Sequence, residues 1–384
     1  MNVLALEPWY SGSHRHFLDG LAEHSEHTFR LITMPGRFWR WRMEGGGVTL
    51  SRKIKEVIDE GFVPDVVFAN DMVNVPAVLS LTRPHLDDVP VVCYFHENQL
   101  TYPLPPDRKR ERAYSITNYL SALAADRVVF NSQYHFDEFT EALPVLLRDF
   151  PDFTHLHTVR EIRDKSTVLH LGMDLSAHDD HAASRPLQST SGGPPVILWN
   201  HRWEYDKNPE AFFRVMNRLD DAGASFQLIL AGKHFREQPE AFERAFERYA
   251  ERILHYGYAE DFAEYSRLLH RADVVVSTAL HEFFGVAMME AVYCGCHPLL
   301  PNRLSYPELI PETHHQPLLH APVLYEEERD LFRILRDILD GTQRTLPHAT
   351  LRDIPCHLNW SNHVHRYDAL LEDTVRASAV PSAE

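Results

Sequence analysis

Two glutamates stand on either side of a predicted helix start in the second half of the chain, with seven residues between them: Glu282 and Glu290. The helix is predicted from about Val286 to Cys294, so both carboxylates can point toward one ligand. Free amides at a helix N-terminus carry partial positive charge and favour an anion. The pattern is typical of a site that binds a diphosphate on the amides of Phe284, Gly285 and Val286. The carboxylates would then bind hydroxyls of a sugar and a ribose; the alternative is a helix-terminal and a solvated glutamate.

Two cations follow the predicted strand Val196–Trp199. Arg202 has a planar guanidinium that can contact two phosphate oxygens, and Lys207 is a mobile point charge. Asn208-Pro209 then starts a helix with proline at its first position. Together the cations can neutralise a diphosphate leaving group. An ordinary surface pair is the alternative, but the position after a strand favours a site.

Polar residues also follow two predicted strands in the first half. Gly12, Ser13 and His14 lie between the first strand and a helix, where small residues let backbone amides approach a phosphate or a sugar. The segment lacks both the P-loop lysine pattern and the three-glycine dinucleotide fingerprint. A second group comes directly after the strand Val91–Phe95 and is suited to lining a cleft: His96, Glu97, Asn98 and Gln99. A structural hydrogen-bonding role is the alternative for His96.

Three arginines are interleaved with three aromatic residues between Arg37 and Arg42. The arginines Arg37, Arg40 and Arg42 can contact phosphates while the aromatic rings stack on bases or sugars. The alternative is an amphipathic segment that packs on its own domain. The formal charge of −17 argues against generic binding of nucleic acid but leaves room for a local basic patch. A second basic cluster occupies residues 108–112.

The composition excludes several other classes of site. No Asp-x-Asp occurs, so the carboxylate pair typical of metal-dependent sugar transfer is missing, and we expect neither a metal nor another cofactor. Lysine, arginine and amide dipoles would do the electrostatic work instead. The four cysteines form neither a zinc pattern nor a disulfide framework, which favours the cytoplasm. No apolar run reaches the roughly 20 residues of a membrane span, so no membrane partner is expected.

The elements that position these residues alternate between short apolar strands and amphipathic helices, which indicates parallel α/β domains. The first half has predicted strands at 3–6, 29–33, 66–69, 91–95, 127–130 and 167–171. The second half has them at 196–199, 226–231, 253–256, 274–277 and 297–300. We predict two doubly wound domains, 1–175 and 196–361, joined by a polar linker at 176–195 and followed by a helix at 362–377.

Four motifs resemble one family of glycosyltransferases. The arginine–lysine and two-glutamate patterns resemble the retaining GT-B enzymes of family 4. Closer still, the chain resembles the tRNA-queuosine α-mannosyltransferase group over nearly its whole length. The segments that carry the likeness are residues 7–14 (EPWYSGSH), 94–103 (YFHENQLTYP), 201–207 (HRWEYDK) and 281–296 (HEFFGVAMMEAVYCGC).

The resemblance implies a GT-B fold, in which two Rossmann-like domains face each other across a cleft. It implies retaining transfer of mannose from GDP-mannose to queuosine in the anticodon of tRNA-Asp. Glu282 would bind the donor sugar, Glu290 the ribose, Arg202 and Lys207 the diphosphate, and His96 would lie beside the sugar. The tail helix would return to the first domain. Transfer to a lipid, a glycan or a small molecule remains an alternative, as does a non-catalytic protein that binds sugar nucleotides or tRNA.

Overall fold

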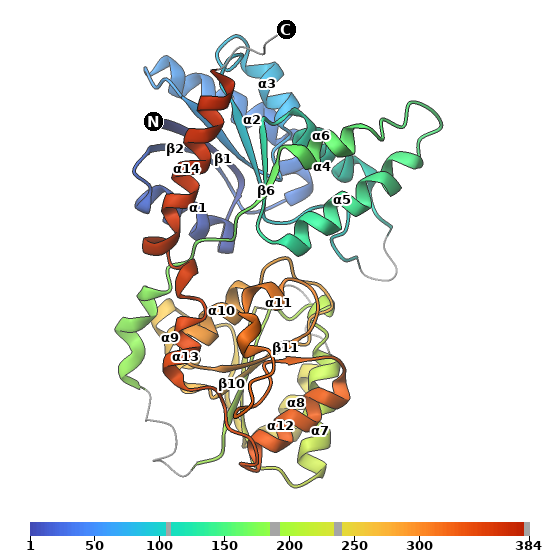
Figure 1. Ribbon diagram of the computed structural model, residues 1–384, viewed down its shortest axis with the longest axis vertical. Coiled ribbons are helices and arrows are strands. Elements are labelled where there is room, and N and C mark those ends of the chain that lie inside the picture. The colour runs from blue at the N-terminus through green and yellow to red at the C-terminus, as the bar shows by residue number, and fades with distance from the viewer. Residues whose placement is uncertain (105–108, 185–192, 234–239, 380–384) are drawn as a thin grey trace. The chain divides into compact units, whose positions relative to one another are not determined.

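Two six-stranded parallel sheets organise the chain in the computed structural model, which describes residues 1–104, 109–184, 193–233 and 240–379 (Figure 1). Each sheet belongs to its own compact unit. Unit 1 comprises residues 1–173 together with the segment that begins at residue 360, and unit 2 comprises residues 174–359. The predicted α/β fold with two doubly wound domains is confirmed.

The sheet of unit 1 has the strand order β2-β1-β3-β4-β5-β6, so the order reverses between β1 and β3. Its strands are β1 (Asn2–Tyr10), β2 (Thr28–Pro35), β3 (Val66–Asn70), β4 (Val91–Phe95), β5 (Arg127–Phe130) and β6 (Ser166–Val168). Its helices are α1 (Gly12–His24), α2 (Trp39–Asp59), α3 (Val75–Thr82), α4 (Arg112–Ala124), α5 (Gln133–Arg148), α6 (Thr158–Asp164) and α14 (Trp360–Ser378).

The sheet of unit 2 has the strand order β12-β11-β10-β7-β8-β9, with the reversal between β7 and β10. Its strands are β7 (Val196–Asn200), β8 (Gln227–Ala231), β9 (Ile253–Gly257), β10 (Val274–Val276), β11 (His297–Pro301) and β12 (Leu324–Tyr325). Its helices are α7 (Pro209–Asp221), α8 (Glu240–Tyr249), α9 (Phe262–Arg271), α10 (Val286–Tyr293), α11 (Tyr306–Leu309), α12 (Glu328–Leu339) and α13 (His348–Asp353). Short 3₁₀ turns are η1 (Ser176–Ser184), η2 (Tyr205–Lys207), η3 (Glu312–His314) and η4 (Cys356–Leu358).

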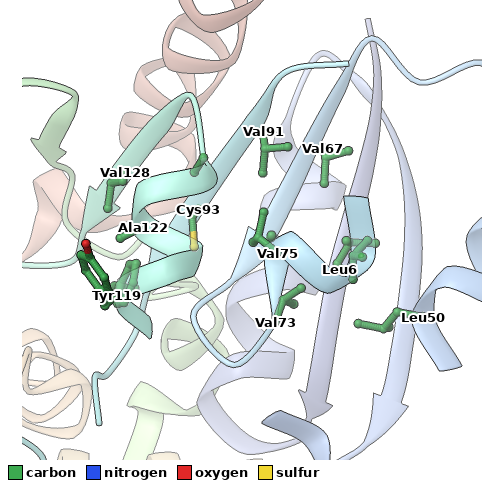
Figure 2. Packing of buried hydrophobic residues seen from close by; sticks show 14 of the residues in the cluster. Leu6, Leu50, Val67, Val73, Val75, Val91, Cys93, Tyr119, Ala122 and Val128 are labelled. Carbon is green, nitrogen blue, oxygen red and sulfur yellow. The ribbon is translucent and has the colours of Figure 1, made fainter. Parts of the chain in front are cut away.

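The central strands of both sheets are mostly apolar because helices cover both faces. In unit 1, side chains from neighbouring strands and from α4 pack into one cluster, which includes Val67, Val91, Cys93, Ala122 and Val128 (Figure 2). Unit 2 has a corresponding core around Trp199, Phe212 and Phe242. Each sheet is therefore a rigid support for the loops at the carboxyl ends of its strands.

The C-terminal helix α14 packs on unit 1 beside α1 (Figure 1). Its first residue, Trp360, is almost fully buried in a slot that two glycines create. A Cβ atom at Gly20 would lie 2.1 Å from the indole Nε1, and one at Gly172 would lie 2.3 Å from the ring. The hydroxyl of Tyr367 donates to the carbonyl of His170 at 2.6 Å. The chain therefore leaves unit 1 after β6 and returns to it only through α14.

Two features differ from the sequence-based expectation. The edge strand β12 was not predicted, because two residues carry no readable alternation. The polar composition of 176–195 predicted a linker, but its described first part packs within unit 2. His178 is buried and hydrogen-bonds Ser266 at 3.0 Å, and Asp179 forms an ion pair with Arg352 at 2.6 Å. Residues 185–192 of that expected linker lie outside the described residues.

Candidate active site

The loops that follow β7 and β10 meet at the point where the strand order of unit 2 reverses. Open α/β sheets bind ligands at such a point, beyond the carboxyl ends of the strands. The loop after β7 contains Arg202 and Lys207, and the loop after β10 contains Glu282. Because these strands are neighbours, residues about 75 positions apart in sequence come into contact.

Lys207 is the centre of this contact. Its ammonium lies 3.2 Å from a carboxylate oxygen of Glu282, 3.2 Å from one of Asp206, and 2.8 Å from the carbonyl oxygen of His281. Its side chain is only 7% exposed, so this lysine is held in place. The expectation of a mobile charge was therefore wrong: the nearby acids and carbonyl bind the ammonium inside the loop.

The ion pair sets the charge of Glu282. Burial alone would raise the pKa of this carboxyl, but the attraction of Lys207 outweighs burial and lowers the pKa to about 2. Glu282 is therefore a fixed carboxylate at neutral pH. Such a group accepts hydrogen bonds from hydroxyls and cannot act as an acid, which suits the predicted binding of a sugar.

Gly285 begins α10 with a backbone geometry that favours glycine. Its φ is +110°, and a Cβ atom there would lie 2.9 Å from the ring of Tyr306. In the described part of the chain no side chain caps α10, so its first amides remain suited to an anion. The predicted helix start at Val286 is confirmed.

Glu290 lies about one turn into the same helix. The hydroxyl of Tyr265 donates to its carboxylate at 2.6 Å, and Asn200 donates to that hydroxyl at 2.9 Å. Burial raises the pKa of Glu290 to about 7, because the single hydrogen bond from Tyr265 only partly offsets it. Asn200 and Tyr265 belong to the site, but the sequence analysis did not predict either of them. Asn200 could have been found because it is a polar residue at the end of a buried strand, whereas Tyr265 lies within a helix.

Arg202 remains accessible beside this group, with 46% of its side chain exposed and a 3.4 Å ion pair to Glu204. Its neighbour His201 has a different role. The His201 imidazole is buried and hydrogen-bonds Ser277 at 3.0 Å, and burial lowers its pKa to about 3. His201 thus links the two central strands as a neutral group, and Arg202 is the cation of this loop that a ligand can reach.

In unit 1 the polar residues meet at the corresponding reversal between β1 and β3. His14 lies 3.2 Å from Glu7 and 3.1 Å from the amide of Asn70. The ring of His96 lies 4.4 Å from that of His14, measured between centroids. The backbone amide of His96 donates to Asp71 at 3.0 Å. Glu7, Asn70 and Asp71 were missed, although Asn70 ends the buried strand β3 and Asp71 follows it in the same way as His96 follows β4.

These buried groups carry different charges. Burial opposes protonation of His14, but the attraction of Glu7 outweighs it and raises the pKa of His14 to about 9. Burial and the neighbouring His14 hold the pKa of His96 well below its usual range. Burial together with Glu97 holds the pKa of Asp71 well above its usual range. At neutral pH the pair is therefore a charged His14 beside a neutral His96.

The remaining residues after β4 are divided between ligand-facing and structural roles. Asn98 is fully buried, and its side-chain oxygen accepts from the amides of Leu100 and Thr101. Gln99 is also buried, and its side chain donates to Glu97 at 3.2 Å. We expected Asn98 and Gln99 to line a cleft and contact an acceptor, but the side chain of Asn98 forms turn bonds and that of Gln99 binds Glu97, which stays partly exposed.

The loops that open α1 and α2 hold the other predicted residues. Gly12 has a φ of +54°, and Ser13 is exposed at the start of α1. Arg37 and Arg40 are exposed, and Arg40 pairs with Glu111 at 3.0 Å. Arg42 is buried and donates twice to the carbonyl of Pro35, so it stabilises the loop and is not placed to contact an acceptor.

One cluster in the described residues has the composition of a metal site, although the sequence analysis expected none. The side chains of Glu7, His14 and His96 offer ligand atoms that all lie within 4.8 Å of one another. The Nδ1 atom of His14 is already shared between Glu7 and Asn70. The cluster lies in unit 1, whereas the predicted diphosphate ligands lie in unit 2.

None of the helices in the described ranges has the length and apolar character of a membrane span. Two Rossmann-like units, each with polar residues at its sheet reversal, define the fold class as GT-B. Solved structures share the fold. The sucrose-phosphate synthase of Thermosynechococcus elongatus matches with a TM-score of 0.71 and 14% identity, covering 98% of this chain and 100% of that one. Anabaena HepE in complex with UDP matches at 0.67 and 16%, covering 97% and 100%.

Sequence comparison narrows the class to a family. Residues 2–173 match the tRNA-queuosine alpha-mannosyltransferase N-terminal family, and residues 182–327 match glycosyl transferases group 1. A tRNA-queuosine alpha-mannosyltransferase of Drosophila melanogaster is 33% identical over 317 residues, which cover 82% of each chain. The chain belongs to the tRNA-queuosine α-mannosyltransferase family, as the four sequence motifs predicted.

Proposed function

We propose that this protein transfers mannose from GDP-mannose to queuosine in the anticodon of tRNA-Asp, with retention of configuration, without a metal ion, and in the cytoplasm. The observation that carries the proposal is the arrangement in unit 2, where the uncapped start of α10 lies between Glu282 and Glu290. Family membership supplies the acceptor and the sugar. The residues around α10 in unit 2 indicate how the donor would be bound.

On the donor side, the diphosphate would bind the first amides of α10 and the guanidinium of Arg202. Glu290, supported by Tyr265, would accept hydrogen bonds from the ribose hydroxyls. Glu282 would bind hydroxyls of mannose as a carboxylate, because Lys207 holds it in that state. Lys207 would therefore act on the donor mainly through Glu282.

In the proposed step, the bond between the anomeric carbon and the diphosphate oxygen breaks as the acceptor hydroxyl bonds to the same face of that carbon. The hydroxyl proton passes to the departing phosphate oxygen. Negative charge grows on the diphosphate during this step, so Arg202 and the α10 amides would stabilise the transition state more than the ground state. The neutral imidazole of His96, in unit 1, would hydrogen-bond a hydroxyl of a bound substrate.

On the acceptor side, unit 1 offers a charged His14 and the partly exposed carboxyl group of Glu97. Hydroxyls of the cyclopentene-diol can donate to the carboxylate and accept from the imidazolium. This pattern suits a vicinal diol, which presents a donor and an acceptor side by side. It supports queuosine over an apolar acceptor.

The experiment is a transfer assay with the full chain. Queuosine-containing tRNA-Asp is incubated separately with GDP-mannose and with UDP-glucose, and the nucleosides released by digestion are analysed by mass spectrometry. We expect one hexose on queuosine with GDP-mannose alone, in an α-linkage that an α-mannosidase removes, and the same yield after chelator treatment. Matched tRNA with guanosine at that position is the control. No hexose on queuosine from either donor would refute the proposal.

A further inference from the structure

Four exposed side chains gather at the start of α2 and form what we call the α2 patch: Arg37, Phe38, Arg40 and Trp41. Phe38 is 71% exposed and Trp41 is 60% exposed, which is high for large apolar residues. The two other members of the sequence motif face inward. Trp39 packs on Tyr114 with ring centroids 5.0 Å apart, and Arg42 binds the carbonyl of Pro35. Two residues of the motif, Trp39 and Arg42, are thus packed against unit 1, and the other four are exposed to solvent.

A strained backbone conformation holds the side chain of Phe38 outward. Its φ of 56° and ψ of 53° lie in the left-handed region, which a bulky residue rarely adopts. Such strain persists only where surrounding contacts enforce it. Here Arg42 ties the loop to Pro35, and Gly36 allows close approach to Ser11, since a Cβ atom at 36 would lie 2.2 Å from that of Ser11.

Trp41 is held in place by its contact with a glycine. Its indole lies against Gly45, one turn along the helix, where a Cβ atom would come within 2.6 Å of the ring. The glycine lets the ring lie on the helix backbone, so the indole has a fixed orientation while 60% of the residue stays open to solvent. A fixed aromatic ring with an open face is suited to stacking.

The α2 patch is continuous with the acceptor-side residues of unit 1. It follows β2, whose carboxyl end lies at the same sheet edge as those of β1 and β3. Ser11, which touches Gly36, directly precedes the segment with Ser13 and His14. On the inner side, Trp39 packs on a small cluster with Met72, the residue after Asp71. A ligand bound near His14 can therefore extend over the α2 patch.

The chemistry of the α2 patch fits one kind of partner. Guanidinium groups lie over aromatic rings, with Arg37 6.0 Å from the ring of Phe38 and Arg40 5.0 Å from that of Trp39. The exposed pair between Arg40 and Glu111 is weak and can be exchanged for a phosphate. Open aromatic rings beside arginines bind unpaired bases and the adjoining backbone. The local positive charge is notable in a chain of net charge −17.

We infer that the α2 patch binds the unpaired bases of an RNA loop, with Phe38 and Trp41 each stacking on one base and Arg37 and Arg40 contacting phosphates. This inference rests on the proposed function, which makes the acceptor a nucleotide of an anticodon loop. Unpaired bases expose the faces that aromatic rings require, whereas a continuous duplex hides them. The α2 patch would hold the loop while the modified nucleotide reaches the acceptor-side residues.

The test measures binding of the full chain to a fluorescent RNA hairpin with the anticodon loop of tRNA-Asp, by anisotropy at fixed salt. Because one stacked base contributes about 1–3 kcal/mol, Phe38→Ala and Trp41→Ala should each weaken binding by roughly 5- to 150-fold. Phe153→Ala is the matched control, since Phe153 is also in unit 1, is 81% exposed and has a positive φ. It should leave the affinity unchanged, and a blunt duplex of equal length should bind all variants equally.

Salt dependence separates the roles of the cations. Arg37→Ala and Arg40→Ala should each reduce the slope of log affinity against log salt by about 0.7, while the aromatic variants keep the wild-type slope. Wild-type affinity of both Phe38→Ala and Trp41→Ala for the hairpin would overturn the inference. If hairpin binding depends on these rings but no hexose reaches queuosine, the proposed function fails and the α2 patch stands. If transfer occurs and the variants bind normally, only the inference fails.

Discussion

Replacing Lys207 with methionine tests the reasoning about unit 2 most directly, because one buried ammonium there balances two acids. The pKa of Glu282 is about 2, compared with 4.5 for a free glutamate, and this difference corresponds to about 3 kcal/mol of stabilisation at neutral pH. Removing one partner of a buried ion pair generally costs about 3–5 kcal/mol, and the value derived from the pKa difference lies at the lower end of this range. We therefore expect Lys207→Met to lower the free energy of unfolding of unit 2 by about 3 kcal/mol at neutral pH.

The direction in which stability changes with pH follows from the direction of the pKa shift of Glu282. Because the folded-state pKa of Glu282 is depressed, its stabilisation is present above about 4.5 and is lost as the pH falls toward 2. In Lys207→Met the largest attraction on this carboxyl is removed, so burial should raise its pKa above 4.5 and acid should relieve the penalty. The difference in stability between wild type and variant should therefore shrink as the pH falls from about 7 to about 3.

The assay is urea unfolding followed by hydrogen exchange of peptides from β7 and β10, which reports on unit 2 separately from unit 1. Lys233→Met is the control, because Lys233 is an exposed lysine of the same unit over the ring of Tyr258. The double variant Lys207→Met/Glu282→Gln should recover part of the loss, since only Asp206 is then left buried without its partner. Unchanged unfolding of Lys207→Met at neutral pH would refute the assignment of this lysine as the counter-charge.

Four further predictions follow from the site and the fold. Arg202→Ala should slow mannose transfer at least about tenfold with unchanged unfolding, because a charge-assisted phosphate contact contributes about 1.5–3 kcal/mol; a near-wild-type rate would contradict its role. The pKa of Glu290 is about 7, so affinity for GDP-mannose should rise as the pH increases through 7, and calorimetry of Glu290→Gln should show this dependence lost. Trp360→Ala should destabilise unit 1 by about 3–5 kcal/mol in thermal unfolding, whereas exposed Trp41→Ala should not. Dialysis against a chelator should leave the transfer rate unchanged; a loss that zinc restores would assign a metal to Glu7, His14 and His96.

Much of the fold could be read from the sequence because local patterns carry it. Strands buried on both faces are continuous apolar runs, so Val91–Phe95 and Arg127–Phe130 were predicted with their observed bounds. The start of α10 at Val286 followed from Gly285 before an apolar helical stretch. Residues directly after such strands, including His96 and Arg202, were found because parallel strands present their carboxyl ends at one edge.

The partners of these residues depended on tertiary structure. Which strands are neighbours decides that Lys207 meets Glu282, and no spacing along the chain encodes that contact. The direction of each side chain decides its role. Asn98 and Arg42 are polar residues in suitable places, yet their side chains satisfy backbone groups that would otherwise be buried without hydrogen bonds. Glu7 was overlooked inside a strand, although the geometry places it against His14.

Glu282 and Glu290 show most clearly what the sequence determines and what the tertiary structure decides. The sequence alone determined that Glu282 and Glu290 flank a helix start, and hence that they could serve one ligand. Their charges were decided only in three dimensions, since burial raises the pKa of both carboxyls and Lys207 reverses the effect at Glu282. The physical reason is that a pKa depends on distances to charges and solvent, and folding sets those distances between residues far apart in the chain.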